Sequence, residues 1–369
     1  MSAEQVIHAV VWFGLGLALL AAGGELLVHG AARLARTLGL SPLVVGLTVV
    51  AYGTSLPELA VTVRAAWTGA GEVALGNVVG SNIVNILLVL GASAVIAPLS
   101  VSVRLIRFDT PVLIGISLIV FLMGWDGKID RMEGAILLAG IVLYTLVVIW
   151  AARREAAPDV AEEYTAAFPA PSKTTKTLLG FYAILCCLGL ALLEVGTRWM
   201  VQSAVQIAQA WGIAELIIGL TIVAIGTSLP EMATSLIAAL RGQRDIAVGN
   251  IVGSCIFNLL LVLGSAGVLS TQGVPVPDQA RWVDLPIMLA TAAVCLPIFF
   301  TGHRIARWEG VVLVGYYLAY TAYLVLRAAQ YEVVMHYFRE TMFLFVFPLT
   351  LLTLIVTVWQ SLRRSDLPK

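Results

Sequence analysis

The stretch Ala51-Tyr52-Gly53-Thr54-Ser55-Leu56-Pro57-Glu58 returns later in the chain as Ala224-Ile225-Gly226-Thr227-Ser228-Leu229-Pro230-Glu231. Both copies lie inside long apolar segments, where a carboxylate is costly. An ionisable side chain at that depth marks a functional site by default. Glu58 and Glu231 are therefore the first candidates for a binding site, and the apolar segments around them decide the fold.

The composition predicts a membrane protein. The 369 residues are 60% hydrophobic and only 12% charged, with a mean hydropathy of +0.95, whereas about a quarter of the residues in a soluble domain are charged. A helix that spans a bilayer needs about 20 mostly apolar residues. Eleven such segments are predicted, near 9–28, 43–66, 74–97, 109–124, 133–151, 178–200, 214–240, 246–269, 284–301, 309–327 and 342–361. They are too long for barrel strands, so we expect an all-α polytopic membrane protein.

The repeat extends well beyond the quoted stretch. A shift of 173 residues aligns Leu43–Gly91 on Leu216–Gly264 without a gap, and 29 of these 49 positions are identical. Each copy contains five predicted spans, and an odd number inserts the second copy from the opposite side of the membrane. Such inverted repeats are typical of secondary transporters, which bind substrate near the bilayer midplane between the repeats.

The predicted organisation follows from the repeat. Two five-helix repeats are expected at 1–150 and 178–328, joined by a flexible cytoplasmic linker at 151–177 that is rich in Ala, Pro and charges. Residues 329–369 add an eleventh transmembrane helix and a cytoplasmic tail. If the N-terminus is outside, 15 of the 22 Lys and Arg residues fall on the inner side. The positive-inside rule therefore predicts an outer N-terminus and a cytoplasmic C-terminus in the cell membrane.

The polar residues of the repeated segments share helix faces. Thr54 and Glu58 are four apart, and Asn77, Ser81 and Asn85 follow at the same spacing in the next span. Pro57 lacks a backbone N–H, so it would free a carbonyl oxygen in a helix that lines a polar cavity. The second copy supplies the equivalent set, namely Thr227, Ser228, Pro230, Glu231, Asn250, Ser254 and Asn258.

These groups are hard oxygen donors, without a thiolate or an imidazole. That set suits Ca²⁺, Na⁺ or K⁺ and argues against zinc or copper. Two carboxylates would neutralise one divalent ion, and without an ion they would repel each other, so one would tend to bind a proton. One ion would then leave only as others replace it, which is a physical basis for exchange.

A structural interpretation competes with this one. Ser and Thr in membrane helices often bond to their own backbone, and Asn pairs can hold helices together. For a single Ser or Thr the two interpretations are equally weighted. For Glu58 and Glu231 the functional one is favoured, because an uncompensated membrane carboxylate costs about 3 kcal/mol or more.

The paired motifs resemble the α-repeats of the cation/Ca²⁺ antiporter superfamily, the sodium/calcium exchangers, in its prokaryotic type. The matching stretches are Gly53–Glu58 with Gly76–Asn85, and Gly226–Glu231 with Gly249–Asn258. The resemblance covers about residues 9–327. It implies a ten-helix inverted-repeat fold (5+5), to which this chain adds an extra C-terminal helix. It also implies Na⁺-driven Ca²⁺ transport by alternating access, with the first and sixth helices sliding against the other eight.

The resemblance also assigns ligands, position by position. It implies Ca²⁺ binding by Glu58 and Glu231 with the backbone oxygens of Thr54 and Thr227. Sodium sites would use the side chains of Ser55, Ser81, Ser228 and Ser254 and the carbonyls of Ala51 and Ala224. Asn85 and Asn258 would complete the polar ring. Many relatives carry Asp where Asn258 stands, and the neutral amide here argues against K⁺ co-transport.

Other function classes remain open at this point. The close alternative is H⁺/Ca²⁺ antiport, since the two Glu residues could carry the coupling protons. A cation channel is a more distant alternative, because a pore motif in an oligomer would be more natural than an inverted repeat. No enzyme motif or resident cofactor is indicated, and a net charge of zero gives no nucleic-acid footprint. The expected partners are Ca²⁺ and Na⁺ as substrates and the lipid bilayer.

Overall fold

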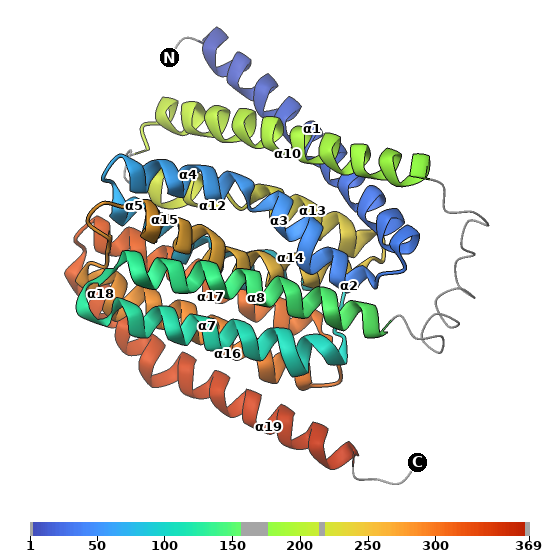
Figure 1. Cartoon of the computed structure of the whole chain (residues 1–369). Coiled ribbons are helices and arrows are strands. Elements are labelled where there is room, and N and C mark those ends of the chain that lie inside the picture. Colours follow the sequence, from blue (N-terminus) through green and yellow to red (C-terminus); the bar gives the residue numbers. More distant parts are fainter. Residues whose placement is uncertain (1–2, 156–175, 214–217, 366–369) are drawn as a thin grey trace.

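The computed structural model describes residues 3–155, 176–213 and 218–365. Most of the linker predicted at 151–177 lies outside these described residues. Within them the protein is a layered bundle of long helices (Figure 1). Two very long helices cross on one side of the bundle, and the C-terminal helix lies along the opposite side (Figure 1).

The first half begins with the 36-residue helix α1. Its elements are α1 (Ala3–Leu38), α2 (Pro42–Val45), η1 (Gly46–Val50), α3 (Ala51–Thr54), α4 (Leu56–Trp67), α5 (Gly71–Ile83), η2 (Val84–Leu90), α6 (Gly91–Ile96), β1 (Leu99–Ser100), η3 (Leu105–Asp109), α7 (Thr110–Met123), η4 (Gly124–Asp126), β2 (Lys128–Ile129) and α8 (Arg131–Glu155). The segments η1, η2 and η3 are π-helical turns inside longer helices, and η4 is a 3₁₀ turn.

The second half repeats this order. Its elements are α10 (Lys176–Ala210), η5 (Gly219–Val223), α12 (Ala224–Gly226), α13 (Leu229–Leu240), α14 (Arg244–Phe257), η6 (Asn258–Val262), α15 (Leu263–Leu269), β3 (Val274–Pro275), η7 (Ala280–Asp284), α16 (Leu285–Phe300), β4 (Arg304–Ile305) and α17 (Arg307–Ala328). The π-helical turns η5, η6 and η7 stand where η1, η2 and η3 stand in the first half. Beyond the repeat follow α18 (Glu332–Thr341), η8 (Met342–Val346) and α19 (Phe347–Ser365).

Eight helices of the described residues are long and apolar enough to cross a membrane, and a ninth is added if the bent pair Pro42–Thr54 and Leu56–Trp67 forms one span. The remaining two predicted segments appear as the shorter apolar helices Leu229–Leu240 and Phe347–Thr357. Residues 214–217, where one of these segments was predicted to begin, lie outside the described ranges. The chain is thus a multi-pass helical membrane protein.

Glycine residues bring α1 and α10 into backbone contact. A Cβ atom added at Gly16 would lie 2.7 Å from the backbone nitrogen of Met200, and one added at Gly189 would lie 2.7 Å from that of Leu27. Gly23 and Gly196 occupy equivalent close contacts. Small residues allow membrane helices to approach this closely. The contact joins the first helices of the two halves into one unit beside the rest of the bundle (Figure 1).

Two short strand pairs support an inverted relation of the halves. Strand β1 pairs with β4 at one end of the bundle, and β2 pairs with β3 at the other. Helix α7 runs from β1 to β2, whereas its counterpart α16 runs from β3 to β4. The two equivalent helices are therefore antiparallel, as insertion of the halves from opposite sides requires.

One side-chain hydrogen bond occurs at equivalent positions in both halves. Tyr144 donates a hydrogen bond to Asp109 Oδ1 at 3.0 Å, and Tyr320 donates one to Asp284 Oδ1 at the same distance. Each bond ties the start of one membrane helix to the middle of the next. The duplication seen in the sequence thus extends to the contacts outside the two motif helices.

The centre of the bundle is formed by the two most buried spans, Gly71–Ile96 and Arg244–Leu269. In their most apolar stretches 72% and 94% of the residues are buried, compared with 22% for the first helix. These spans carry Asn85 and Asn258, so the polar residues of the repeat lie at the core and not at the lipid surface.

Candidate ion-binding site

The repeated motif interrupts a helix in each half. Ser55 lies between α3 and α4 with φ −84° and ψ 4°, and Ser228 adopts φ −89° and ψ 7° before α13. Pro57 and Pro230 occupy the first turns that follow, where a missing N–H is tolerated. In the first half the two helical pieces meet at a 45° bend. The breaks place Glu58 and Glu231 in the first turn of α4 and of α13.

Almost every predicted site residue with a described side chain is buried. Glu58, Glu231, Asn85 and Asn258 are all 0% exposed. The other buried residues of the predicted set are Ala51, Thr54, Ser55, Ser81, Ser228 and Ser254. Thr227 is half-buried. Ala224 begins α12 directly after the π-helical turn η5.

Hydrogen bonds run crosswise between the halves. Thr54 Oγ1 donates to Asn250 Oδ1 at 3.2 Å, and Thr227 Oγ1 donates to Asn77 Oδ1 at 3.4 Å. Thr54 Oγ1 also lies 3.5 Å from Ser254 Oγ, while Ser81 Oγ lies 3.4 Å from Thr227 Oγ1. The broken helix of each half is therefore held by the polar face of the other, and the two motifs form one site.

The two carboxylates have different surroundings. Ser55 Oγ donates to Glu231 Oε1 at 3.2 Å. The symmetric bond from Ser228 to Glu58 is not formed. Among the described residues, Ser228 Oγ and both carboxylate oxygens of Glu58 have no hydrogen-bond partner. The site is therefore asymmetric, although the two motifs are identical from Gly53 to Glu58 and from Gly226 to Glu231.

Asn77 and Asn250 belong to this network but were not among the predicted ligands. Asn77 Nδ2 donates to Thr62 Oγ1, and Asn250 Nδ2 donates to Ser235 Oγ, each at 2.9 Å. Each amide also donates to the backbone oxygen of the Glu in its own half, at 3.4 Å. Their spacing from Ser81 and Ser254 was the signal for the shared face. Thr62 and Ser235 gave no separate signal in the sequence.

Several buried oxygen atoms at the centre lack a partner. Within the described residues this holds for Glu58 Oε1 and Oε2, Glu231 Oε2, Asn85 Oδ1, Asn258 Oδ1 and Ser228 Oγ. Neither carboxylate forms an ion pair with a described basic side chain. A buried carboxylate without hydrogen bonds or a counter-charge is strongly unfavourable. A cation that meets these oxygens would relieve that cost.

The donor set determines which cations fit. No group of three or more His, Cys, Asp or Glu side chains that could hold a metal ion occurs in the described residues. The described cysteines are all free thiols. Carboxylate, amide and hydroxyl oxygens are the ligands of hard cations such as Ca²⁺ and Na⁺.

The helical bundle, the repeated broken helices and a buried oxygen site between the halves define a secondary ion transporter. Comparison with known sequences gives the family: the profile described as "Sodium/calcium exchanger protein" matches residues 8–150 and 181–326. The chain belongs to the sodium/calcium exchanger family.

The match to the relatives extends over nearly their full lengths. The chain is 42% identical over 320 residues to the putative antiporter CaxA of Alkalimonas amylolytica. The match covers 85% of this chain and 98% of that protein. It is 30% identical over 338 residues to the sodium/calcium exchanger MaX1 of Methanosarcina acetivorans, with 83% of this chain and 95% of that protein covered. The sodium-calcium exchanger NCX_Mj, solved with Na⁺ and Sr²⁺, superposes with a TM-score of 0.73 at 31% identity, covering 86% of this chain and 98% of that one. The predicted exchanger fold is thus confirmed.

Proposed function

We propose that the chain exchanges Na⁺ for Ca²⁺ across the membrane by alternating access, with the ions bound between the two halves. The observation that carries this proposal is the group of buried, partnerless oxygen atoms around Glu58 and Glu231. Two carboxylates would balance the charge of one Ca²⁺. The family membership supports exchange as the mode of transport.

The proposed ligands fall into two groups, one for Ca²⁺ and one for Na⁺. Ca²⁺ would meet Glu58 and Glu231 together with backbone oxygens of Thr54 and Thr227. Sodium ions would use the hydroxyl oxygens and the backbone carbonyl oxygens on either side. The proposed sodium ligands are Ser55, Ser81, Ser228, Ser254, Ala51 and Ala224, and Asn85 and Asn258 would complete the ring.

The hydroxyl and amide oxygens favour Na⁺ over H⁺ as the coupling ion. A proton needs only the carboxylates, whereas Na⁺ needs several neutral oxygens around them. The competing function, H⁺/Ca²⁺ antiport, rests on the partnerless oxygens of Glu58, which could hold a proton when no metal ion is bound. The two functions differ in the gradient that drives Ca²⁺ movement.

Uptake of ⁴⁵Ca²⁺ into proteoliposomes separates them. Vesicles loaded with Na⁺ and diluted into Na⁺-free buffer are compared with vesicles loaded with K⁺ and with acid-loaded vesicles. Uptake that requires internal Na⁺ supports the proposal. Uptake driven by the pH gradient alone would overturn it in favour of H⁺/Ca²⁺ antiport.

Substitution of the carboxylates tests the site itself. Glu58→Gln and Glu231→Gln should each abolish Ca²⁺ uptake, because the remaining charge no longer balances a divalent ion, while both variants still fold. Glu72→Gln is the matched control, since Glu72 is exposed in the first turn of α5. Retained uptake in either site variant would contradict the ligand assignment.

The orientation of the chain is part of the proposal. We place the N-terminus outside, so the turn before β2 should face outward and the turn after β1 should face inward. With exposed Cys187 replaced by Ala, Asp126→Cys should react with a membrane-impermeant thiol reagent on intact cells, and Val103→Cys should not. The reverse pattern would invert the topology.

A further inference from the structure

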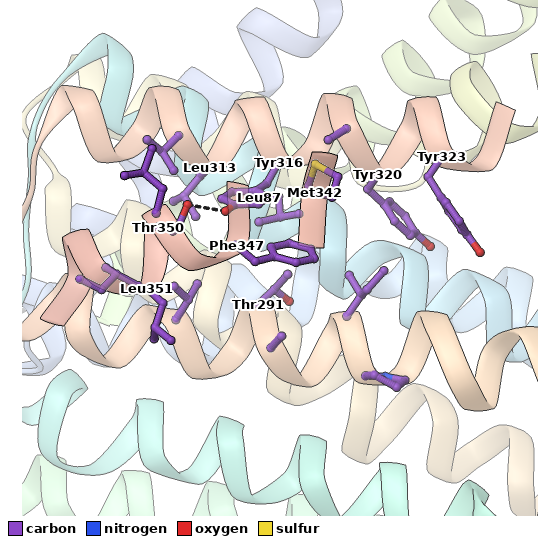
Figure 2. Close-up of a pocket in the computed structure, with 18 of the residues that line it drawn as sticks. Leu87, Thr291, Leu313, Tyr316, Tyr320, Tyr323, Met342, Phe347, Thr350 and Leu351 are labelled. Carbon is purple, nitrogen blue, oxygen red and sulfur yellow. Dashed lines mark hydrogen bonds between the residues drawn. The ribbon is translucent and has the colours of Figure 1, made fainter. Parts of the chain in front are cut away.

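A cavity of about 890 Å³ lies between the repeat and the C-terminal helix. Its walls are α16, α17 and the continuous helix formed by α18, η8 and α19, with Leu87 at its base. Figure 2 shows Tyr320 and Tyr323 toward one end and Thr350 and Leu351 toward the other. We call this cavity the α16–α19 groove. It uses none of the proposed ion ligands.

The walls of the groove are apolar along most of its length. It extends from Trp282 in η7 to Ile298 in α16, and along α17 from Trp308 to Tyr323. At 1.5 Å per residue these stretches are about 22–24 Å long, which exceeds half of the hydrocarbon thickness of about 30 Å. The hydroxyls of Tyr316 and Thr350 in the middle are hydrogen-bonded to each other. The interior therefore suits a hydrocarbon chain and not a polar ligand.

One end of the groove is polar and carries an arginine. Met342 lies beside Tyr316 and Tyr320 (Figure 2), and Arg339 is about one helical turn before it, toward the end of α17. Arg339 lines the groove, is exposed, and forms no ion pair with any residue that the structure describes. The nearby acidic Glu340 is already engaged by His336 at 3.3 Å.

Aromatic side chains accompany Arg339 at this end. Trp282 and Tyr323 both line the groove there, and Arg327 Nη1 donates to the Tyr323 hydroxyl at 3.5 Å. Trp and Tyr concentrate at the level of lipid headgroups. An arginine at that level attracts lipid phosphate. The arginine and the aromatic side chains thus place this end of the groove at the level of the lipid headgroups, and the apolar walls extend from there into the hydrocarbon layer.

We propose that the α16–α19 groove is a binding site for a phospholipid of the surrounding bilayer. Its phosphate contacts Arg339, and one acyl chain lies between α16, α17 and α19. The lipid completes the packing of the eleventh helix on the repeat. This site is separate from ion exchange and stands whether or not the chain couples to Na⁺.

Native mass spectrometry of the purified full chain tests the site. Delipidated protein is titrated with phosphatidylglycerol, and the fraction that retains one lipid is measured. Arg339→Gln should weaken retention about fivefold, the factor that corresponds to about 1 kcal/mol for one arginine near a lipid headgroup. Ala319→Trp, which fills the groove from α17, should abolish it.

The control variant is Arg64→Gln. Arg64 is an exposed helical arginine whose side chain forms no hydrogen bond or ion pair with a described residue, and its replacement should leave retention unchanged. Thermal unfolding of each variant checks its fold, and Arg339→Gln keeps the test valid if Ala319→Trp fails to fold. Equal retention by wild type and Arg339→Gln would overturn the proposal. Displacement of the signal by inorganic phosphate would also overturn it, because headgroup chemistry alone would then explain the binding.

Discussion

At the scale of single residues, hydroxyls behind the ion site fix the amides that face it. Thr62 accepts a hydrogen bond from Asn77, and Ser235 accepts the equivalent bond from Asn250. Thr62→Val removes a net contribution of about 1 kcal/mol. We expect the Ca²⁺ concentration for half-maximal uptake to rise about fivefold. Uptake itself should be retained, because the variant removes the hydrogen bond that orients the Asn77 side chain but leaves its amide oxygen in the site.

The second half provides the control for this prediction. Ser occupies the position equivalent to Thr62, so Thr62→Ser preserves a hydroxyl that already serves this role at Ser235. Uptake by Thr62→Ser should match the wild type. Equal impairment of the Ser and Val variants would show that side-chain volume, and not the hydrogen bond, matters at this position.

The residues gathered at the centre were largely predictable from the sequence. Helical spacing placed Asn77, Ser81 and Asn85 on one face, and the repeat implied a second face opposite. The unequal environments of Glu58 and Glu231 could not be predicted, because the two motifs have the same letters. Only the packed structure makes the two environments differ. Ser55 donates a hydrogen bond to Glu231, whereas no described residue donates one to the carboxylate of Glu58.

At the scale of elements, the contact between α1 and α10 depends on glycine. Gly189→Leu would drive a side chain into the backbone of Leu27 and Gly23, so the helices must separate. Overpacking of this kind costs about 1–3 kcal/mol. We expect a lower midpoint of thermal unfolding in detergent, with reduced Ca²⁺ uptake.

Two glycines on the same helices serve as controls. An added Cβ at Gly14 or at Gly180 meets no atom within 4 Å. Gly14→Leu and Gly180→Leu should therefore leave the unfolding midpoint close to that of the wild type. A decrease of the same size in these variants would indicate that helix backbone effects, and not the interface, explain the loss.

Element boundaries were less predictable than element identity. The first span was expected near 9–28, but α1 extends over Ala3–Leu38. An apolar window detects only the part of a helix that matches bilayer thickness, whereas the helix itself continues while its backbone bonds can be made. The π-helical turns η2 and η6 that contain Asn85 and Asn258 were also not predicted, because an extra residue per turn leaves no clear mark in composition.

At the scale of the whole molecule, the C-terminal helix lies outside the part that forms the ion site. The family profile ends at residue 326, and every proposed ligand precedes α18. Deletion of residues 330–369 should therefore leave Na⁺-dependent Ca²⁺ uptake in place while abolishing retention of the groove lipid. Uptake in proteoliposomes and native mass spectrometry measure the two properties separately. Loss of uptake in a truncated chain that still unfolds cooperatively would show that α19 supports the transport cycle.

The crosswise bonds from Thr54 to Asn250 and from Thr227 to Asn77 have an evolutionary consequence. The hydroxyls of both threonines also donate to an asparagine of the opposite half, so each half supplies hydrogen-bond partners to an inverted copy beside it. A gene for one half alone would give a working product only if its chains entered the membrane in both directions and assembled as antiparallel pairs. Fusion into one polypeptide fixes that pairing at one to one and frees each copy to diverge.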